Sequence, residues 1–529
     1  GESVKVVIAG SDVGYINVDE IELLKVGEAS GFNNILRFVV KDMIGDAIIS
    51  KNEARIEFTM PYGTDISALT PYEIIISEGA SISPAIDKAQ NFENPVQYTV
   101  TSSDNVEKVW TIVCKIADKT LVAKSSNEKL QEAFAWCVQK ALQWVQTGKT
   151  GVINMYEGSA GTDGHEYIPS YWAGYKHRSG FYIRDYAHQV AGATFLGLNE
   201  ENYSMLKAFA DTSTEARKWY ALWALNFDGS PLLIDYKNDN NFVREVPAMF
   251  ELVEKGCELY KITGDQRYIS EDMLAFYERI MNEFIELHDT QIVNGVAEGT
   301  DGGIFQGSAT YNEMGDHPIE AGDGLASQYR ANVALADLFK QIGNEEKAQK
   351  YYDAAEKLKK YFIEEWGVPE NDEFFYNRGY DIDGKKLESF AKEGSWFMAM
   401  KGITPPGERT TGFLQYIHDK MHDDYYKSPN IEAYTYLPDT FFPYGEDEKG
   451  WYWMEYIIDR LDDNHHVSNQ GKNADYPEVS FTLISQTIGW LLGVNANVPA
   501  GTVETLSHLP EAIADLEVNY IPVGNNEIK

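Results

Sequence analysis

The chain has 529 residues, of which 43% are hydrophobic and 24% charged, which excludes a disordered chain and predicts a packed protein too long for one hydrophobic core. Its 82 acidic and 45 basic side chains give a net charge of -37, which repels nucleic acids and anionic lipid surfaces. Three cysteines without a Cys-x-x-Cys pair argue against a disulfide framework or a zinc site, and no apolar run approaches the roughly 20 residues of a membrane-spanning helix.

Residues 4–118 have the pattern of β-strands. Apolar and polar side chains alternate in residues 54–60 (ARIEFTM), and residues 35–40 (ILRFVV) are rich in β-branched and aromatic types. Turn-prone stretches such as residues 102–105 (SSDN) separate these runs. The sequence therefore predicts a small antiparallel, Ig-like β-sandwich in residues 1–118. Because a strand is expected soon after the first residue, we expect any export signal to have been removed.

Three segments of this region resemble a known β-domain. Residues 60–65 (MPYGTD), 74–84 (IIISEGASISP) and 94–102 (NPVQYTVTS) are similar to the β-domain of bacterial surface proteins that is common in glycan-degrading lipoproteins of Bacteroidota. The resemblance implies a secreted protein, periplasmic or at the cell surface, whose precursor could carry a lipid anchor. It implies a spacing or orienting role for this domain and no chemistry.

From about Lys124 onward the pattern is helical, because apolar residues recur at i, i+3, i+4 and i+7. Eleven helices are predicted, with room for a hidden twelfth: 126–147, 184–198, 201–226, 245–262, 266–288, 322–342, 345–366, 388–401, 407–425, 449–461 and 477–493. Long loops between them, such as 289–321 and 427–448, favour hairpins arranged in a ring with a cleft on one face. We expect an (α/α)6 toroid in residues 119–529, with a C-terminal extension in 496–529; a tetratricopeptide-type solenoid is disfavoured because no repeat period is found.

A candidate sugar-binding pair lies at the start of the second predicted helix, in residues 179–189 (SGFYIRDYAHQ). Arg184 offers a planar fork of donors and Asp185 accepts hydroxyl protons, so the pair can hold vicinal hydroxyls; a buried structural ion pair is the alternative. The motif aromatic-x-Arg-Asp resembles that of the glucoamylase-like, six-hairpin glycosidases, and this resemblance implies that the pair grips the terminal sugar. Over the rest of residues 126–495 the resemblance is limited to the number and order of the predicted helices.

Further candidates for substrate binding come from the same resemblance. Residues 240–247 (NNFVREVP) resemble the cleft-lining loop before the fourth helix, with Arg244 and Glu245 in place of the Arg-Pro-Gln-x-Asp-Gly sequence of true glucoamylases, so starch specificity is not implied. Trp396 and Asp439 lie near predicted helix ends or in loops and are expected to line sugar subsites, with core packing as the alternative for Trp396.

Glycoside hydrolysis needs one carboxylic acid to protonate the leaving oxygen and a second carboxylate to activate water or attack the anomeric carbon. In six-hairpin glycosidases the acid usually lies between the fifth and sixth helices, where the loop 289–321 of this chain contains Glu298, Asp301, Glu313, Asp316 and Glu320. We predict Glu313 as the acid, with Glu298 as its rival because apolar neighbours would raise its pKa. A solvated or calcium-binding loop is the alternative.

The second carboxylate of that superfamily lies near the start of the last helix, where Glu478 stands in residues 475–481 (DYPEVSF). Glu478 is therefore the predicted base, although a carboxylate in a first helical turn is also favoured by the helix dipole. The adjacent residues His465 and His466 are not predicted to bind a metal, because neighbouring side chains point in different directions and no matching carboxylate cluster is evident.

Together these features predict an exo-acting, inverting glycoside hydrolase that uses no cofactor and acts on a polysaccharide or a glycan-derived oligosaccharide. One rival is a polysaccharide lyase on the same toroid, in which His188 and His466 would matter; a cleft for uronates should be basic, whereas the loops here are acidic and aromatic. The other rival is a non-catalytic glycan-binding protein. The sequence predicts no oligomeric state.

Overall fold

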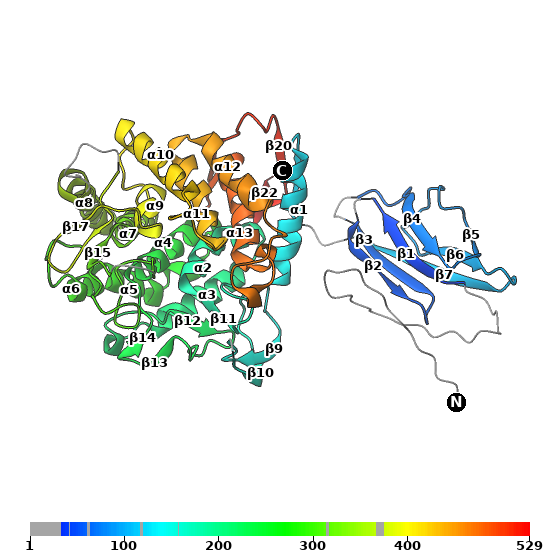
Figure 1. The fold of residues 1–529 in the computed structure, drawn as a ribbon, viewed down its shortest axis with the longest axis horizontal. Coiled ribbons are helices and arrows are strands. Elements are labelled where there is room, and N and C mark those ends of the chain that lie inside the picture. Colours follow the sequence, from blue (N-terminus) through cyan, green and yellow to red (C-terminus); the bar gives the residue numbers. More distant parts are fainter. Residues whose placement is uncertain are drawn as a thin grey trace. The chain divides into compact units, whose positions relative to one another are not determined.

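The computed structural model describes residues 33–528, except for residues 42, 61–63, 117–119, 157, 314–316 and 367–374. The start of the predicted strand region in 4–32, the turn at 61–63 and the acidic residue Asp316 lie outside the described residues. The chain divides near Thr120 into two compact units, which we describe separately (Figure 1). None of the helices described is long and apolar enough to cross a membrane.

The first unit consists of two β-sheets that share one core. One sheet pairs β1 (Ile35–Val40) with β4 (Pro71–Ile76), and the other has the order β2 (Ile44–Ser50), β3 (Arg55–Met60), β7 (Glu107–Ile116), β6 (Val96–Thr101) and β5 (Ser81–Ser83). Alternate residues such as Phe38, Phe58 and Trp110 point into the core, as the alternating pattern predicts. The pair β3 and β7 is parallel, so the larger sheet is mixed and the prediction of a wholly antiparallel sandwich is wrong at this pair.

The second unit is a ring of helices, and the predicted toroid is confirmed. The inner helices are α2 (Ile183–Phe195), α4 (Val246–Thr263), α7 (Gly322–Gln341), α9 (Glu393–Met400), α11 (Glu432–Phe441) and α13 (Pro477–Gln486). Each contacts the next in this order, and α13 contacts α2, which closes the ring. The outer layer holds α1 (Glu128–Gln143), α3 (Asn199–Thr212), α5 (Glu271–Arg279), α6 (Ile285–His288), α8 (Glu345–Tyr361), α10 (Glu408–His422) and α12 (Asp447–Ile458) (Figure 1).

The two layers follow from the distribution of apolar residues. In α4 nearly every side chain is buried, as a helix surrounded by neighbours requires, whereas α8 buries only the stripe Ala348, Tyr351, Ala355 and Leu358. The predicted helices 245–262 and 322–342 match α4 and α7 to within one residue. The predicted helix 201–226 is too long: α3 ends at Thr212, and Lys218 and Trp219 take positive φ values that no helix continues through.

Short strands fix the loops that precede the inner helices. β11 (Gly180–Tyr182) pairs with β12 (Ala224–Asn226) and leads into α2, while β15 (Glu320–Ala321) leads into α7 and pairs with β16 (Gly379–Tyr380), which also pairs with β17 (Lys386–Leu387). The other strands of this unit form five pairs, and they are β8 (Val122–Ser125) with β20 (Leu516–Asn519), β9 (Thr150–Ile153) with β10 (Thr162–Glu166), β13 (Tyr236–Asn238) with β14 (Asn241–Phe242), β18 (Val494–Asn497) with β19 (Thr502–Thr505), and β21 (Ile521–Val523) with β22 (Asn526–Ile528). Near the C-terminus, β20 pairs with β8 and β21 contacts α2.

The ring is closed by a tight contact between α2 and α13. A Cβ atom added at Gly192 would lie 2.1 Å from the main-chain oxygen of Phe481. We therefore expect Gly192→Ala to lower the free energy of unfolding by about 1–3 kcal/mol, measured by urea denaturation, because the backbones must separate. Gly489→Ala is the control, since no described atom lies within 4 Å of its added Cβ. Equal stabilities of the two variants would contradict this account of the contact.

Candidate active site

The N-terminal ends of five inner helices converge on one pocket with a cavity volume of about 160 Å³. Its lining residues come from α2, α9, α11 and α13 and from the loops before α2, α7, α9, α11 and α13, and they are Tyr175, Arg184, Tyr311, Asn312, Glu313, Lys392, Glu393, Ser428, Asn430, Glu432, Ala433, Tyr436, Tyr476 and Glu478. Helical side chains tilt toward the N-terminus, so residues in first turns reach this end of the ring. The pocket therefore brings together loops that are far apart in the sequence.

The lining is acidic and aromatic. Four carboxylates line the pocket, Glu313, Glu393, Glu432 and Glu478, while Arg184 and Lys392 supply the basic groups among the described lining residues. Carboxylates accept hydroxyl protons and aromatic rings offer apolar faces, which is the chemistry that an uncharged sugar ring requires. The predicted acid and the predicted base thus lie in one pocket with Arg184.

Arg184 faces the loop that carries Glu313. Its guanidinium donates a hydrogen bond of 3.2 Å to the main-chain oxygen of Tyr311 and lies 3.9 Å from the Glu313 carboxylate. The guanidinium also lies over the rings of Trp223 and Tyr311. The Glu313 side chain is 45% exposed, so it can meet a ligand that enters the pocket.

Asp185 lies behind the pocket wall and not in its lining. The Tyr476 hydroxyl donates to its carboxylate. Burial, followed by the nearby charge of Glu478, raises the pKa of Asp185 to about 7. The predicted pair is therefore divided: Arg184 lines the pocket, whereas Asp185 supports the lining residue Tyr476.

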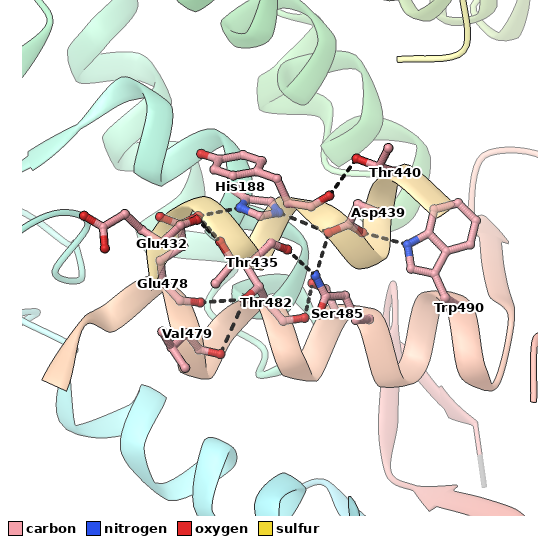
Figure 2. Close-up of polar contacts among 12 residues, drawn as sticks. His188, Glu432, Thr435, Asp439, Thr440, Glu478, Val479, Thr482, Ser485 and Trp490 are labelled. Atoms are coloured by element: carbon pink, nitrogen blue, oxygen red, sulfur yellow. Dashed lines mark hydrogen bonds and ion pairs between the residues drawn. The ribbon is translucent and has the colours of Figure 1, made fainter. Parts of the chain in front are cut away.

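His188 on α2 lies between two carboxylates (Figure 2). Its Nδ1 lies 2.5 Å from Oε1 of Glu478 and its Nε2 lies 3.1 Å from Oδ2 of Asp439. Ionised carboxylates only accept hydrogen bonds, so both ring nitrogens carry protons and the imidazole is cationic. Burial opposes this charge, but the hydrogen bonds to Asp439 and Glu478 prevail and raise the pKa of His188 to about 9. The ring stacks on Tyr436 with centroids 4.0 Å apart.

The carboxylates of Glu478 and Asp439 differ in how many of their oxygens already accept hydrogen bonds from the protein. Glu478 uses Oε1 for both His188 and the Thr435 hydroxyl, which donates over 2.9 Å. Asp439 accepts from Trp490 through Oδ1 and from Gln486 and His188 through Oδ2 (Figure 2). Asp439 does not line the pocket, so its contacts favour a supporting role over the predicted sugar binding.

Glu432, at the start of α11, is a pocket carboxylate that sequence reasoning missed. The Tyr175 hydroxyl donates to its Oε1 over 3.1 Å, and His465 lies 3.0 Å from its Oε2. In the sequence, residues 464–466 (NHH) are a metal or general-base candidate, and His466 is also a candidate of the lyase rival. No group of three or more ligands able to hold a metal ion occurs among the described residues. His465 is conspicuous in the sequence, but its carboxylate partner Glu432 is 33 residues away in a region predicted as a loop.

Four further candidates lie outside the pocket lining. The Glu298 carboxylate accepts the main-chain N–H groups of residues 290–292, so it organises its own loop. Arg244 donates to two main-chain oxygens and packs over the Phe242 ring, 4.5 Å from its centroid. Trp396 is fully buried in the core, as its alternative interpretation proposed.

The fourth of these, Glu245, precedes α4 and is buried. Neither of its carboxylate oxygens has a hydrogen-bond partner among the residues that the structure describes. Burial and then the charge of Glu313 raise the pKa of Glu245 well above its usual range.

Comparisons with known proteins address both units. The family model described as "SGBP, N-terminal" matches residues 35–114. The helical fold is similar to the GH78 family rhamnosidase of Bacillus sp. GL1 (TM-score 0.53, 10% identity, 81% of this chain and 43% of that chain) and to the α-L-rhamnosidase of Aspergillus terreus (TM-score 0.51, 11% identity, 93% of this chain and 54% of that chain). This chain spans about half the length of these two enzymes. No curated protein matches significantly.

A third similar structure is the rhamnosidase from Klebsiella oxytoca with rhamnose bound (TM-score 0.50, 10% identity, 74% of this chain and 69% of that chain). At such identities the likeness establishes the fold and leaves the chemistry to the site. These three similar structures are rhamnosidases by name, and the likeness of fold extends over 74–93% of this chain.

Proposed function

We propose that the protein is an exo-acting, inverting glycoside hydrolase of the six-hairpin type that removes a terminal sugar from a glycan. The observation that carries the proposal is the pocket itself, in which Glu313 and Glu478 come from separate segments to one cavity beside Arg184. A cavity of about 160 Å³ suits one terminal sugar. The helical likeness to rhamnosidases supports hydrolysis as the reaction class.

In the proposed reaction Glu313 protonates the oxygen of the leaving group, and Glu478 takes a proton from the water that attacks the anomeric carbon. The contacts of Glu478 support its role as base: His188 and Thr435 anchor Oε1, so Oε2 is available to a water molecule. Inversion requires the water to attack from the face opposite the leaving group, between carboxylates roughly 6.5–9.5 Å apart. Arg184 holds the ring through its hydroxyls.

The match to the SGBP model in residues 35–114 supports a glycan as the partner and a location outside the cytoplasm, periplasmic or at the cell surface. The same match is compatible with the rival hypothesis of a non-catalytic protein that binds a glycan in this pocket and does not cleave it. An acidic lining disfavours the lyase rival, because a uronate needs its carboxylate neutralised.

An NMR time course on a panel of glycans and aryl glycosides, rhamnosides included, tests the function. We expect release of one monosaccharide whose first-formed anomer is opposite to that of the substrate. A product with the same anomeric configuration as the substrate would contradict inversion but would still support hydrolysis. An unsaturated product with rising ultraviolet absorbance would show a lyase, and glycan binding without any product would favour a binding protein.

A further inference from the structure

The start of α11 and the segment before it contribute four polar pocket residues that the proposed reaction does not use: Ser428, Asn430, Glu432 and Tyr436. Glu432 and Tyr436 are four residues apart on one helix, so they lie on the same face, one turn above the other. Both line the pocket that holds Glu478. This face of α11 is therefore available to a bound ligand.

Glu432 is held in place by two neutral donors. The main-chain N–H of Val467 donates to Nδ1 of His465 over 3.0 Å, so Nδ1 carries a lone pair and the ring proton is on Nε2. This N–H donates to Oε2 of Glu432, while Tyr175 donates to Oε1. The His465 side chain is completely buried and stacks on Tyr476, so it cannot turn away. Glu432 is thus oriented without a cation to neutralise it.

This arrangement leaves acceptor capacity on Glu432 for a ligand. A carboxylate has about four acceptor positions, and Tyr175 and His465 fill one on each oxygen. The remaining position on each oxygen can accept a hydroxyl proton, so the group can hold two adjacent hydroxyls. His188 is different, since it places a positive charge directly on Glu478. The two histidines therefore give the two carboxylates different properties.

Tyr436 provides the second, independent observation. Its side chain is 3% exposed, yet its hydroxyl has no hydrogen-bond partner within the described part of the chain. The buried side-chain oxygen of Asn430 is likewise unpartnered in these residues. Buried polar atoms without partners are rare because they forfeit their hydrogen bonds to water. Since both residues line the pocket, a ligand that brings hydroxyl groups would complete them.

We infer that Glu432 and Tyr436 form a hydroxyl-binding subsite that selects an uncharged sugar ring with two adjacent hydroxyls; this inference rests on the proposed function. Glu432 accepts both hydroxyl protons, and the Tyr436 hydroxyl bonds a neighbouring oxygen. A uronic acid is disfavoured, because its carboxylate would meet the charges of Glu432 and Glu478 in a buried site. His465 and Tyr175 are positioning residues that act through Glu432.

Calorimetric titration of the full chain tests the subsite with a panel of neutral monosaccharides, rhamnose included, and glucuronic acid. We expect at least one neutral sugar to bind and glucuronic acid to bind at least about tenfold more weakly. Glu432→Gln should raise Kd for the best sugar about 10- to 100-fold, and Tyr436→Phe about 2- to 10-fold. The controls Glu455→Gln and Tyr452→Phe, on the outer helix α12, should bind like the unchanged protein.

Two further comparisons separate binding from folding. His465→Gln keeps an N–H donor and should retain most of the affinity, whereas His465→Leu should lose about as much as Glu432→Gln. For sugar analogues that lack one hydroxyl, the ratio of Kd between Glu432→Gln and the unchanged protein should be smaller than for the complete sugar. Folded Glu432→Gln protein with unchanged affinity, or no binding of any neutral sugar, would overturn the subsite. Sugar binding without hydrolysis would refute the proposed reaction but leave the subsite standing.

Discussion

Glu478→Gln should lower kcat about 10²- to 10⁴-fold on the glycoside that the protein hydrolyses fastest, because an amide cannot take the proton of the attacking water. KM should change little, since sugar binding relies on Arg184, Glu432 and Tyr436. The loss should persist when the leaving group is a dinitrophenol, because this step does not depend on leaving-group protonation. Initial rates on two aryl glycosides of different leaving ability measure both effects.

Glu313→Gln is the companion variant, and its dependence on the leaving group should be the reverse. It should lose comparable activity on natural glycosides and regain most of it on dinitrophenyl glycosides, which leave without protonation. Glu298→Gln is the control for the rival acid: its carboxylate accepts main-chain N–H groups, so the variant should lose stability but keep its turnover when folded. Full turnover of both Glu313→Gln and Glu478→Gln would disprove the assigned roles.

The sequence predicts the helical ring well where burial follows helical spacing. The limits of α4 and α7 agree with their predicted ranges because their apolar residues recur with the helical period over four or more turns. Helix α11 was missed, since its ten residues (EAYTYLPDTF) combine Pro438 with β-branched and aromatic residues of low helix propensity. It forms because Leu437, Phe441 and their neighbours pack into the core of the ring. Tertiary packing overrides local preference at this helix.

The site was predictable in part for a related reason. Arg184 and Glu478 were found because each stands in a motif at a helix start, and Glu313 was found because its loop is rich in carboxylates; all three line the pocket. The contact between His188 and Glu478 joins residues 290 positions apart, and no local pattern signals such a partner. Glu432 was hidden for both reasons, since it starts the missed helix and its partners Tyr175 and His465 lie on other loops. The contacts of such positioning residues form only when the closed ring brings distant segments together.

His188→Asn is expected to reduce the free energy of unfolding by about 3–5 kcal/mol at pH 6, because the buried Glu478 and the partly buried Asp439 then have no cation between them. In the unchanged protein the pKa of His188 is raised from 6.5 to about 9, a difference that corresponds to about 3 kcal/mol. Because the pKa of His188 is higher in the folded than in the unfolded state, its contribution to the free energy of unfolding is complete below pH 6.5. This contribution is lost as the pH rises through about 9. Urea denaturation between pH 6 and pH 10 should therefore show the stabilities of the two proteins converging.

The same variant separates positioning from a purely structural role through the pH dependence of catalysis. The imidazolium of His188 is in direct contact with Glu478. Burial and nearby charges, Glu478 among them, raise the pKa values of Asp185, Tyr436 and Tyr476. The variant removes a positive charge from beside the proposed base, so the acidic limb of kcat/KM should move to higher pH. His508→Asn, which breaks a 2.8 Å contact with the single carboxylate Asp447, should leave that limb in place. An unmoved limb in folded His188→Asn protein would assign His188 to structure alone, whereas a shift limited to that variant would identify the imidazolium as the group that sets this limb.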